Sequence, residues 1–141
     1  MYFIGFTGTR HGMTTEQEVS VRLLLEDLNP GLRGALHHGD CVGADAEAHR
    51  IAVDLGITTM IHPPSDTRLR AYCRGGQFTF MAEPYTQRNR SIVEHSDVMI
   101  ACPSSSTELR TGGTWQTVRM ARGSRKRLFI VWPDGSVKEE P

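Results

Sequence analysis

Three short segments of the chain are rich in glycine, serine, threonine and aspartate, and each follows a candidate strand. The candidates for ligand contact within them are Thr7, Gly8, Thr9 and Arg10, then Gly39, Asp40, Gly43, Ala44 and Asp45, then Pro103, Ser104, Gly112, Gly113 and Thr114. Where such a segment opens a helix, unpaired backbone N–H groups lie beside the positive end of the helix dipole. This pattern predicts an anion site, most simply for a phosphate.

Arginines near these segments are candidates for contact with the same anion. Arg10 lies at the mouth of the first segment, and its planar guanidinium suits a phosphate better than a lysine would. Arg88 and Arg90 are two residues apart, so a helix directs them about 200° apart and only one of them can face the ligand squarely. The alternative for each arginine is a solvated surface position.

Acidic and aromatic residues supply the remaining candidates. Asp40 and Asp45 either accept hydrogen bonds from ribose hydroxyls or only cap the following helix. Glu108 is the one carboxylate between Pro103 and Thr114, which makes it the candidate nucleophile or general base, with an exposed loop charge as the alternative. Trp115 either stacks on a base or anchors the loop by being buried.

Apolar runs and helical periodicities alternate along the chain and must position these residues. Strands are expected at 2–6, 35–38, 57–62, 98–102 and 127–132, with helices after Thr15, from Ala44 to Leu55, from Pro84 to about His95 and from Thr114 to Arg122. This alternation predicts an α/β fold, namely a single doubly wound, mostly parallel five-stranded Rossmann-like sheet in the order 3-2-1-4-5, with helices on both faces. Ligands bind such sheets where the winding reverses, so we expect the three glycine-rich segments to meet there.

Within the first helix, Thr15 and Glu18 predict a capping box, and Asn29-Pro30-Gly31 predicts the end. The expected inner face of this helix consists of Val19, Leu23, Leu24 and Leu28. One domain is expected over residues 1–133, with a polar tail at 134–141. Residues 63–83 form an insertion that is either a lid over the site or a surface excursion.

Composition excludes several classes of protein. The chain has 16 basic and 16 acidic residues, so no overall positive field favours nucleic acid as a partner. Its three cysteines are far apart and its six histidines show no metal-binding spacing, so neither a metal nor a cofactor is expected.

The first apolar run is too short for a signal peptide or a membrane span, and we expect a cytoplasmic protein. No G-x-G-x-x-G motif with an acidic ribose-binding residue is present, which argues against a dehydrogenase.

Four stretches resemble the SLOG superfamily of Rossmann-like proteins: FTGTR, HGDCVGAD, RNRSIVEHSDVMIACP and RTGGTWQTVRMA. This superfamily includes the Lonely Guy phosphoribohydrolases, the DprA proteins, YpsA-like proteins and sensor domains of bacterial antiviral systems. The chain is most similar to the small stand-alone YspA/YpsA-related (DUF2493-like) members, over residues 3 to about 132. The most specific features are the GTW-x-T-V-R and RNR-x-I-V patterns.

The resemblance implies a nucleotide site with phosphate at Gly112-Gly113-Thr114 and the Gly8 and Gly43 loops around the ligand. In the hydrolases, a P-G-G-x-G-T-x-x-E motif supplies a catalytic glutamate, which acts with an arginine from the preceding helix. The glutamate position falls on Thr117 here, whereas Arg88 or Arg90 matches the arginine. Glu108 could replace the missing glutamate only if its loop folds back over the ligand.

These observations favour a binder of a nucleotide or nucleotide-derived signal that acts as a sensor or sequestering module. The alternative is a nucleotide N-glycosidic hydrolase or transferase that acts on a nucleoside monophosphate-type substrate. Family habit implies a homodimer or higher homo-oligomer.

Overall fold

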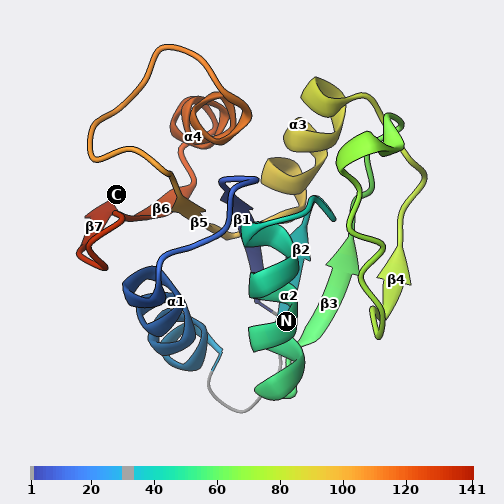
Figure 1. Ribbon diagram of the computed structural model, residues 1–141, viewed down its shortest axis with the longest axis horizontal. Coiled ribbons are helices and arrows are strands. Elements are labelled where there is room, and N and C mark those ends of the chain that lie inside the picture. Colours follow the sequence, from blue (N-terminus) through green and yellow to red (C-terminus); the bar gives the residue numbers. More distant parts are fainter. Residues whose placement is uncertain (1, 30–33) are drawn as a thin grey trace.

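The structure, a computed structural model, describes residues 2–29 and 34–141 of the chain (Figure 1). Seven strands of the described residues form one sheet in the order β4-β3-β2-β1-β5-β6-β7. The strands are β1 (Phe3–Gly8), β2 (Ala35–His38), β3 (Thr58–Ile61), β4 (Phe78–Thr79), β5 (Val98–Cys102), β6 (Arg127–Val131) and β7 (Val137–Glu140). All neighbouring strands pair in parallel except β6 and β7, which are antiparallel.

The five predicted strands correspond to β1, β2, β3, β5 and β6, and their observed order is the predicted 3-2-1-4-5. The predicted number of strands was wrong, because one further strand lies at each edge of the sheet. β4 comes from the 63–83 insertion, and β7 comes from the stretch that we expected to be a polar tail. Both are short and mostly exposed, as edge strands commonly are, so neither has a buried apolar face to signal it in the sequence.

Helices cover both faces of the sheet, as predicted (Figure 1). They are α1 (Thr15–Leu28), α2 (Ala44–Asp54), α3 (Tyr85–His95) and α4 (Gly113–Gly123), with a short 3-10 helix at Thr67–Leu69. One core joins α1 and α2 to the sheet through fully buried residues such as Ile4 and Ile100. The other core joins α3 and α4 to the opposite face through Met99 and Ile130. In that second core Ile92 and Val93 are buried.

The first helix begins one residue earlier than predicted and buries a different face. Its capping box joins Thr14 to Gln17, not Thr15 to Glu18. Val21 and Leu25 are fully buried, whereas the predicted Val19 and Leu23 are each 56 % exposed. Of the predicted inner face, Leu24 and Leu28 do pack partly against the core. The predicted stop at Asn29-Pro30-Gly31 lies mostly outside the described residues.

The strands that end at the switch point bring their loops to one rim of the sheet. β1 pairs with β2 on one side and with β5 on the other, and Gly8 at its end is in register with Cys102. The backbone N–H of Thr9 then donates to the carbonyl of Cys102 at 3.0 Å. In the part of the chain that the structure describes, no helix has the length and apolar character needed to cross a bilayer.

Candidate functional site

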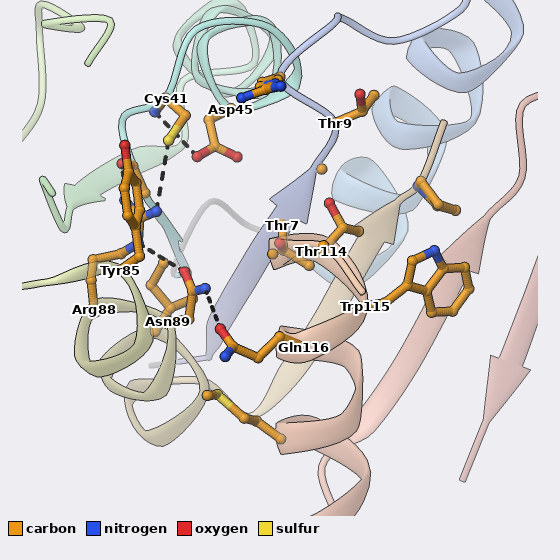
Figure 2. Close-up of a pocket in the computed structure, with 18 of the residues that line it drawn as sticks. Thr7, Thr9, Cys41, Asp45, Tyr85, Arg88, Asn89, Thr114, Trp115 and Gln116 are labelled. Atoms are coloured by element: carbon orange, nitrogen blue, oxygen red, sulfur yellow. Dashed lines mark hydrogen bonds between the residues drawn. The ribbon is translucent and has the colours of Figure 1, made fainter. Parts of the chain in front are cut away.

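A groove of about 1520 Å³ opens at this rim and continues between α3 and α4 as far as the C-terminal end of α4 (Figure 2). Most of the predicted contact residues line it, namely Thr7, Gly8, Thr9, Arg10, Gly39, Asp45, Arg88, Arg90, Pro103, Ser104, Gly112, Gly113, Thr114 and Trp115. Four predicted site residues do not line it, and these are Asp40, Gly43, Ala44 and Glu108. The first and third glycine-rich segments therefore share a groove, and only part of the second reaches it.

The N-terminus of α4 presents open backbone amides to the groove. Its N-cap residue is Gly112, which has φ 102° and makes no side-chain capping bond, and the first turn contains no acidic residue. The first backbone bond of the helix is donated by Gln116 to the carbonyl of Gly112. A Cβ added at Gly112 would meet no heavy atom within 4 Å, and one at Gly113 would meet only Asn89 Nδ2 at 4.0 Å. An anion placed here would meet both free N–H groups and the helix dipole.

The N-terminus of α2, in contrast, is closed by the first loop. The N–H of Ala44 donates to the carbonyl of Thr9 at 2.9 Å. A Cβ on Gly43 would lie 2.7 Å from that same oxygen and closer still to the carbonyl of Arg10. Ala44 is fully buried, and a Cβ on Gly8 would lie 2.6 Å from its side chain. Gly43 and Ala44 therefore pack the two loops together instead of facing the groove, because the close approach leaves no space for a ligand.

Arg88 forms the opposite wall of the groove and is only 5 % exposed (Figure 2). Its guanidinium donates to the carbonyl of Gly39, to the carbonyl of His62 at 3.3 Å and to Asn89 Oδ1 at 2.9 Å. Its remaining described contact is a long one, from Nη2 to Cys41 Sγ at 3.7 Å. None of these described bonds goes to a carboxylate, so the direct hydrogen-bond partners of the buried guanidinium are all neutral.

Asp45 is the buried carboxyl group nearest to this charge within the groove lining. It is 6 % exposed and accepts a hydrogen bond from the N–H of Cys41 at 3.2 Å. Burial raises the pKa of Asp45 to about 6, although the charge of Arg88 acts in the opposite direction. The group is thus mostly ionised at neutral pH and half-protonated about one pH unit lower, which suits either a proton transfer or a pH-sensitive ligand contact.

Asp40 has a structural role instead of the predicted ligand contact. Its carboxylate accepts from Arg70 Nε and from the N–H of Cys73, each at 2.9 Å. Its carbonyl accepts from the N–H of Ala71 at 2.7 Å. Because Asp40 is 1 % exposed and fully engaged in these bonds, it attaches the 63–83 insertion to the end of β2.

Glu108 lies on the surface outside the groove lining and is paired with two arginines. Its carboxylate is 2.8 Å from Arg122 Nη1 and 3.3 Å from Arg119 Nη2. The hydrogen bond from Arg122 lowers the pKa of Glu108, so it stays a carboxylate. Leu109 and Arg110 of the same loop line the groove, but Glu108 itself does not. Thr117, at the hydrolase glutamate position, bonds to the carbonyl of Gly113 within its own helix.

Trp115 contributes to the groove wall but is itself 2 % exposed. Its ring packs on Trp132 with centroids 5.8 Å apart, and its Nε1 donates to Ser105 Oγ at 3.4 Å. These contacts correspond to the anchoring alternative, in which the indole fixes the loop before α4.

Sequence reasoning missed several polar residues of the groove. Asn89 and Gln116 join α3 to α4 through a 3.2 Å hydrogen bond beside Gly113 (Figure 2). Tyr85 lies under the guanidinium of Arg88, with the ring centroid 5.3 Å from Cζ. Tyr85 precedes Arg88 by three residues and Asn89 by four, which are spacings that bring side chains to one side of a helix, and that periodicity was the available signal.

Charge is distributed unevenly around the groove. Six arginines line it, namely Arg10, Arg68, Arg88, Arg90, Arg110 and Arg119, against two aspartates, Asp45 and Asp66. Asp66 is already paired with Arg68 at 2.6 Å. The described groove is therefore positive although the whole chain has no net charge.

Comparisons with known proteins identify the fold. No protein-family model matches the sequence, and no curated protein sequence matches it significantly. Among solved structures, the chain is similar to the molybdenum cofactor binding protein of Rippkaea orientalis, with a TM-score of 0.72 and 21% identity over 93% of this chain and 76% of that chain. It is also similar to the molybdenum cofactor carrier protein of Chlamydomonas reinhardtii, with a TM-score of 0.69 and 19% identity over 92% and 76% of the two chains.

DNA processing protein A (DprA) of Streptococcus pneumoniae has the same fold, with a TM-score of 0.64 and 19% identity over 92% of this chain. The chain spans half the length of that DprA. At these identities the likeness concerns the fold alone. The chain has the Rossmann-like α/β fold of these proteins.

Proposed function

We propose that the chain binds a small phosphorylated ligand with a nucleotide-like heterocycle, and that the groove holds it without cleaving it. The support comes from the groove and from its fold relatives, two of which are named for binding or carrying the molybdenum cofactor. Such a module would sense or sequester its ligand. The predicted site residues that line the groove are the proposed contacts.

The observation that carries the proposal is the buried guanidinium of Arg88, whose described bonds include no carboxylate, facing the groove opposite the uncapped N-terminus of α4. A buried charge is costly unless an opposite charge or several hydrogen bonds compensate for it. The carboxyl group of Asp45 is close enough for the charge of Arg88 to lower its pKa, but it makes no described bond to Arg88. A phosphate between the two walls would supply a directly bonded opposite charge to Arg88 and acceptors to the open amides of Gly113 and Thr114.

Binding is better supported than hydrolysis because the expected catalytic carboxylates are missing from the groove. Glu108 is held by Arg119 and Arg122 on the surface, and Thr117 bonds within α4. One observation favours N-glycosidic hydrolysis as a second candidate function. Asp45 lines the groove with a pKa raised to about 6 by burial, as a general base would require.

The test is calorimetric titration with adenosine monophosphate, adenosine and inorganic phosphate. We expect the monophosphate to bind more tightly than the nucleoside, because only the monophosphate reaches the amides of α4. Replacing Arg88 by Met should lower the affinity roughly 10–150-fold, the usual worth of a charge-assisted hydrogen bond. Arg50→Met is the matched control, since Arg50 is exposed on α2 and outside the groove lining.

A second variant separates binding from folding. Gly113→Leu should project into the groove without a clash, because a Cβ there meets only Asn89 at 4.0 Å. It should weaken monophosphate binding while the thermal unfolding midpoint stays close to that of the parent. Equal affinity for adenosine and its monophosphate would contradict the proposal, and release of free adenine would establish the hydrolase instead.

A further inference from the structure

We propose that His38, His49 and Cys73 form a binding site for Zn²⁺ or a similar thiophilic divalent cation, apart from the arginine-lined groove. One ligand atom from each of the three side chains lies within 4.8 Å of the other two. They come from three separate segments, namely the end of β2, the middle of α2 and the 63–83 insertion. This separation explains why no metal-binding spacing is visible in the sequence.

The two imidazoles already converge at a distance close to that of a metal site. His38 Nε2 and His49 Nδ1 are 3.0 Å apart. Two tetrahedral Zn–N bonds of about 2.0–2.1 Å place their nitrogens roughly 3.3 Å apart, so the rings need to separate only slightly. Cys73 Sγ lies within 4.8 Å of a ligand nitrogen of each ring, so it has to approach by at most about 1 Å to complete the set. Two nitrogens and a thiolate match the preference of Zn²⁺, and a solvent oxygen can take the fourth position.

The second ring nitrogen of His49 has the kind of hydrogen-bond partner that a metal-binding histidine requires. Its Nε2 donates to the carbonyl of Arg74 at 2.6 Å, which fixes the tautomer with the lone pair of Nδ1 directed at the cluster. Arg74 is the neighbour of Cys73 in the chain, so the insertion supplies both the thiol and this support. His38 and His49 are 0 % and 6 % exposed, whereas Cys73 is half-buried and gives an ion access from solvent.

Metal binding must displace two protons from their present positions. The N–H of Asp40 donates to His38 Nδ1, so the proton of His38 is on Nε2 and bonds to His49. Coordination through Nε2 moves this proton to Nδ1, where it faces the N–H of Asp40, so the bond from Asp40 breaks and the Asp40 peptide has to turn away from the ring. The thiol of Cys73 gives up its proton to solvent as the S–metal bond forms, because the thiolate is the form that binds the ion. Binding therefore releases one proton per ion and retains the second as a shifted tautomer.

Occupancy of this site would fix one wall of the groove. The insertion that contains Cys73 also contributes Arg68 and Leu69 to the groove lining. A bond from Cys73 to α2 and β2 would hold that segment against the sheet. This assignment does not depend on the proposed ligand of the groove.

The test is addition of Co²⁺ to the full chain with a non-thiol reductant, followed by displacement with Zn²⁺. We expect one Co²⁺ per chain, intense visible bands of a tetrahedral ion and a near-ultraviolet charge-transfer band from the thiolate. Zn²⁺ should abolish these bands. Cys73→Ser should lose the charge-transfer band, and His49→Gln should lower Zn²⁺ affinity by more than the roughly 10–100-fold expected from loss of an outer-shell partner.

Cys41→Ser is the matched control, because Cys41 is also a half-buried cysteine but lies outside the cluster. It should retain both bands. Circular dichroism without metal checks that each variant is folded. Weak octahedral bands alone, or a charge-transfer band that persists in Cys73→Ser, would overturn the assignment.

Discussion

Replacing Gly43 by Ala tests whether the first two glycine-rich loops pack against each other as the structure shows. Gly43 has φ 89°, a conformation that costs a residue with a Cβ about 1–3 kcal/mol. The added Cβ would also lie 2.7 Å from the carbonyl oxygen of Thr9 and closer to that of Arg10, and forced overpacking costs about 1–3 kcal/mol more. The free energy of unfolding should therefore fall by roughly 2–6 kcal/mol.

Gly112→Ala is the matched control, because Gly112 has a similar φ of 102° but no heavy atom within 4 Å of an added Cβ. Its free energy of unfolding should fall only by the cost of the positive φ, about 1–3 kcal/mol. Urea unfolding of both variants measures the difference, which corresponds to a midpoint about 1 M lower for Gly43→Ala. Equal destabilisation of the two variants would refute the close packing at Gly43, and with it the reason that Gly43 does not face the groove.

Further predictions concern acid stability, the surface carboxylate and the last strand. Burial lowers the pKa values of His37 and His62 to about 4 and about 3, so the unfolded chain, with ordinary histidines, binds more protons as the pH falls. The free energy of unfolding should decrease by several kcal/mol between about pH 7 and pH 4, and a flat profile of urea midpoints would contradict this. Glu108→Gln should lower the free energy of unfolding by no more than about 1 kcal/mol and leave monophosphate affinity unchanged, as measured by urea unfolding and calorimetry. Deleting residues 134–141 uncovers the edge of β6, and light scattering should detect self-association.

The central sheet could be predicted because its strands carry strong signals. β5 is buried along its whole length, and β6 is buried apart from Arg127, so both appear in the sequence as continuous apolar runs. The order 3-2-1-4-5 was assumed as a usual one for doubly wound sheets, because the alternation of strands and helices does not select it by itself. β7 has the sequence VKEE and forms backbone bonds to β6 with exposed side chains, so no periodicity distinguishes it from a tail.

The buried face of α1 was predicted wrongly for a different reason. Val19 and Leu23 form one row at a spacing of four residues, and Val21 and Leu25 form another. Both rows satisfy a helical period, and only tertiary contacts decide between them. Gln17 lies in the buried row with Val21 and Leu25, and its Nε2 donates to the carbonyls of Pro103 at 2.8 Å and Val131 at 2.9 Å. Because Gln17 is polar, the sequence gave no reason to place it on the inner face.

For the site, the composition predicted that the glycine-rich segments lie at one rim of the sheet, but not which glycines face the groove. Gly112 and Gly43 are both N-cap glycines with positive φ, yet one opens its helix to the groove and the other is covered by backbone. The difference depends on whether another loop packs against the glycine: the carbonyls of Thr9 and Arg10 lie against Gly43, and no described residue lies against Gly112. Such packing is a tertiary contact that the sequence does not show. The same is true of Asp40, whose partners Arg70 and Cys73 are some 30 residues away along the chain.

The zero net charge of the whole chain does not describe the groove, because charge is distributed unevenly between the groove and the rest of the chain. Six of the 16 basic residues and only two of the 16 acidic residues line it, which leaves ten basic and fourteen acidic residues for the rest of the chain. A small anion inside the groove experiences mainly the local excess of arginines, because charges farther than about 8–10 Å are screened at physiological salt. A long polyanion would extend beyond the groove over a surface with an acidic excess. The affinity should therefore depend on salt as expected for one or two phosphates, and a steep dependence that grows with oligonucleotide length would instead support a nucleic-acid site.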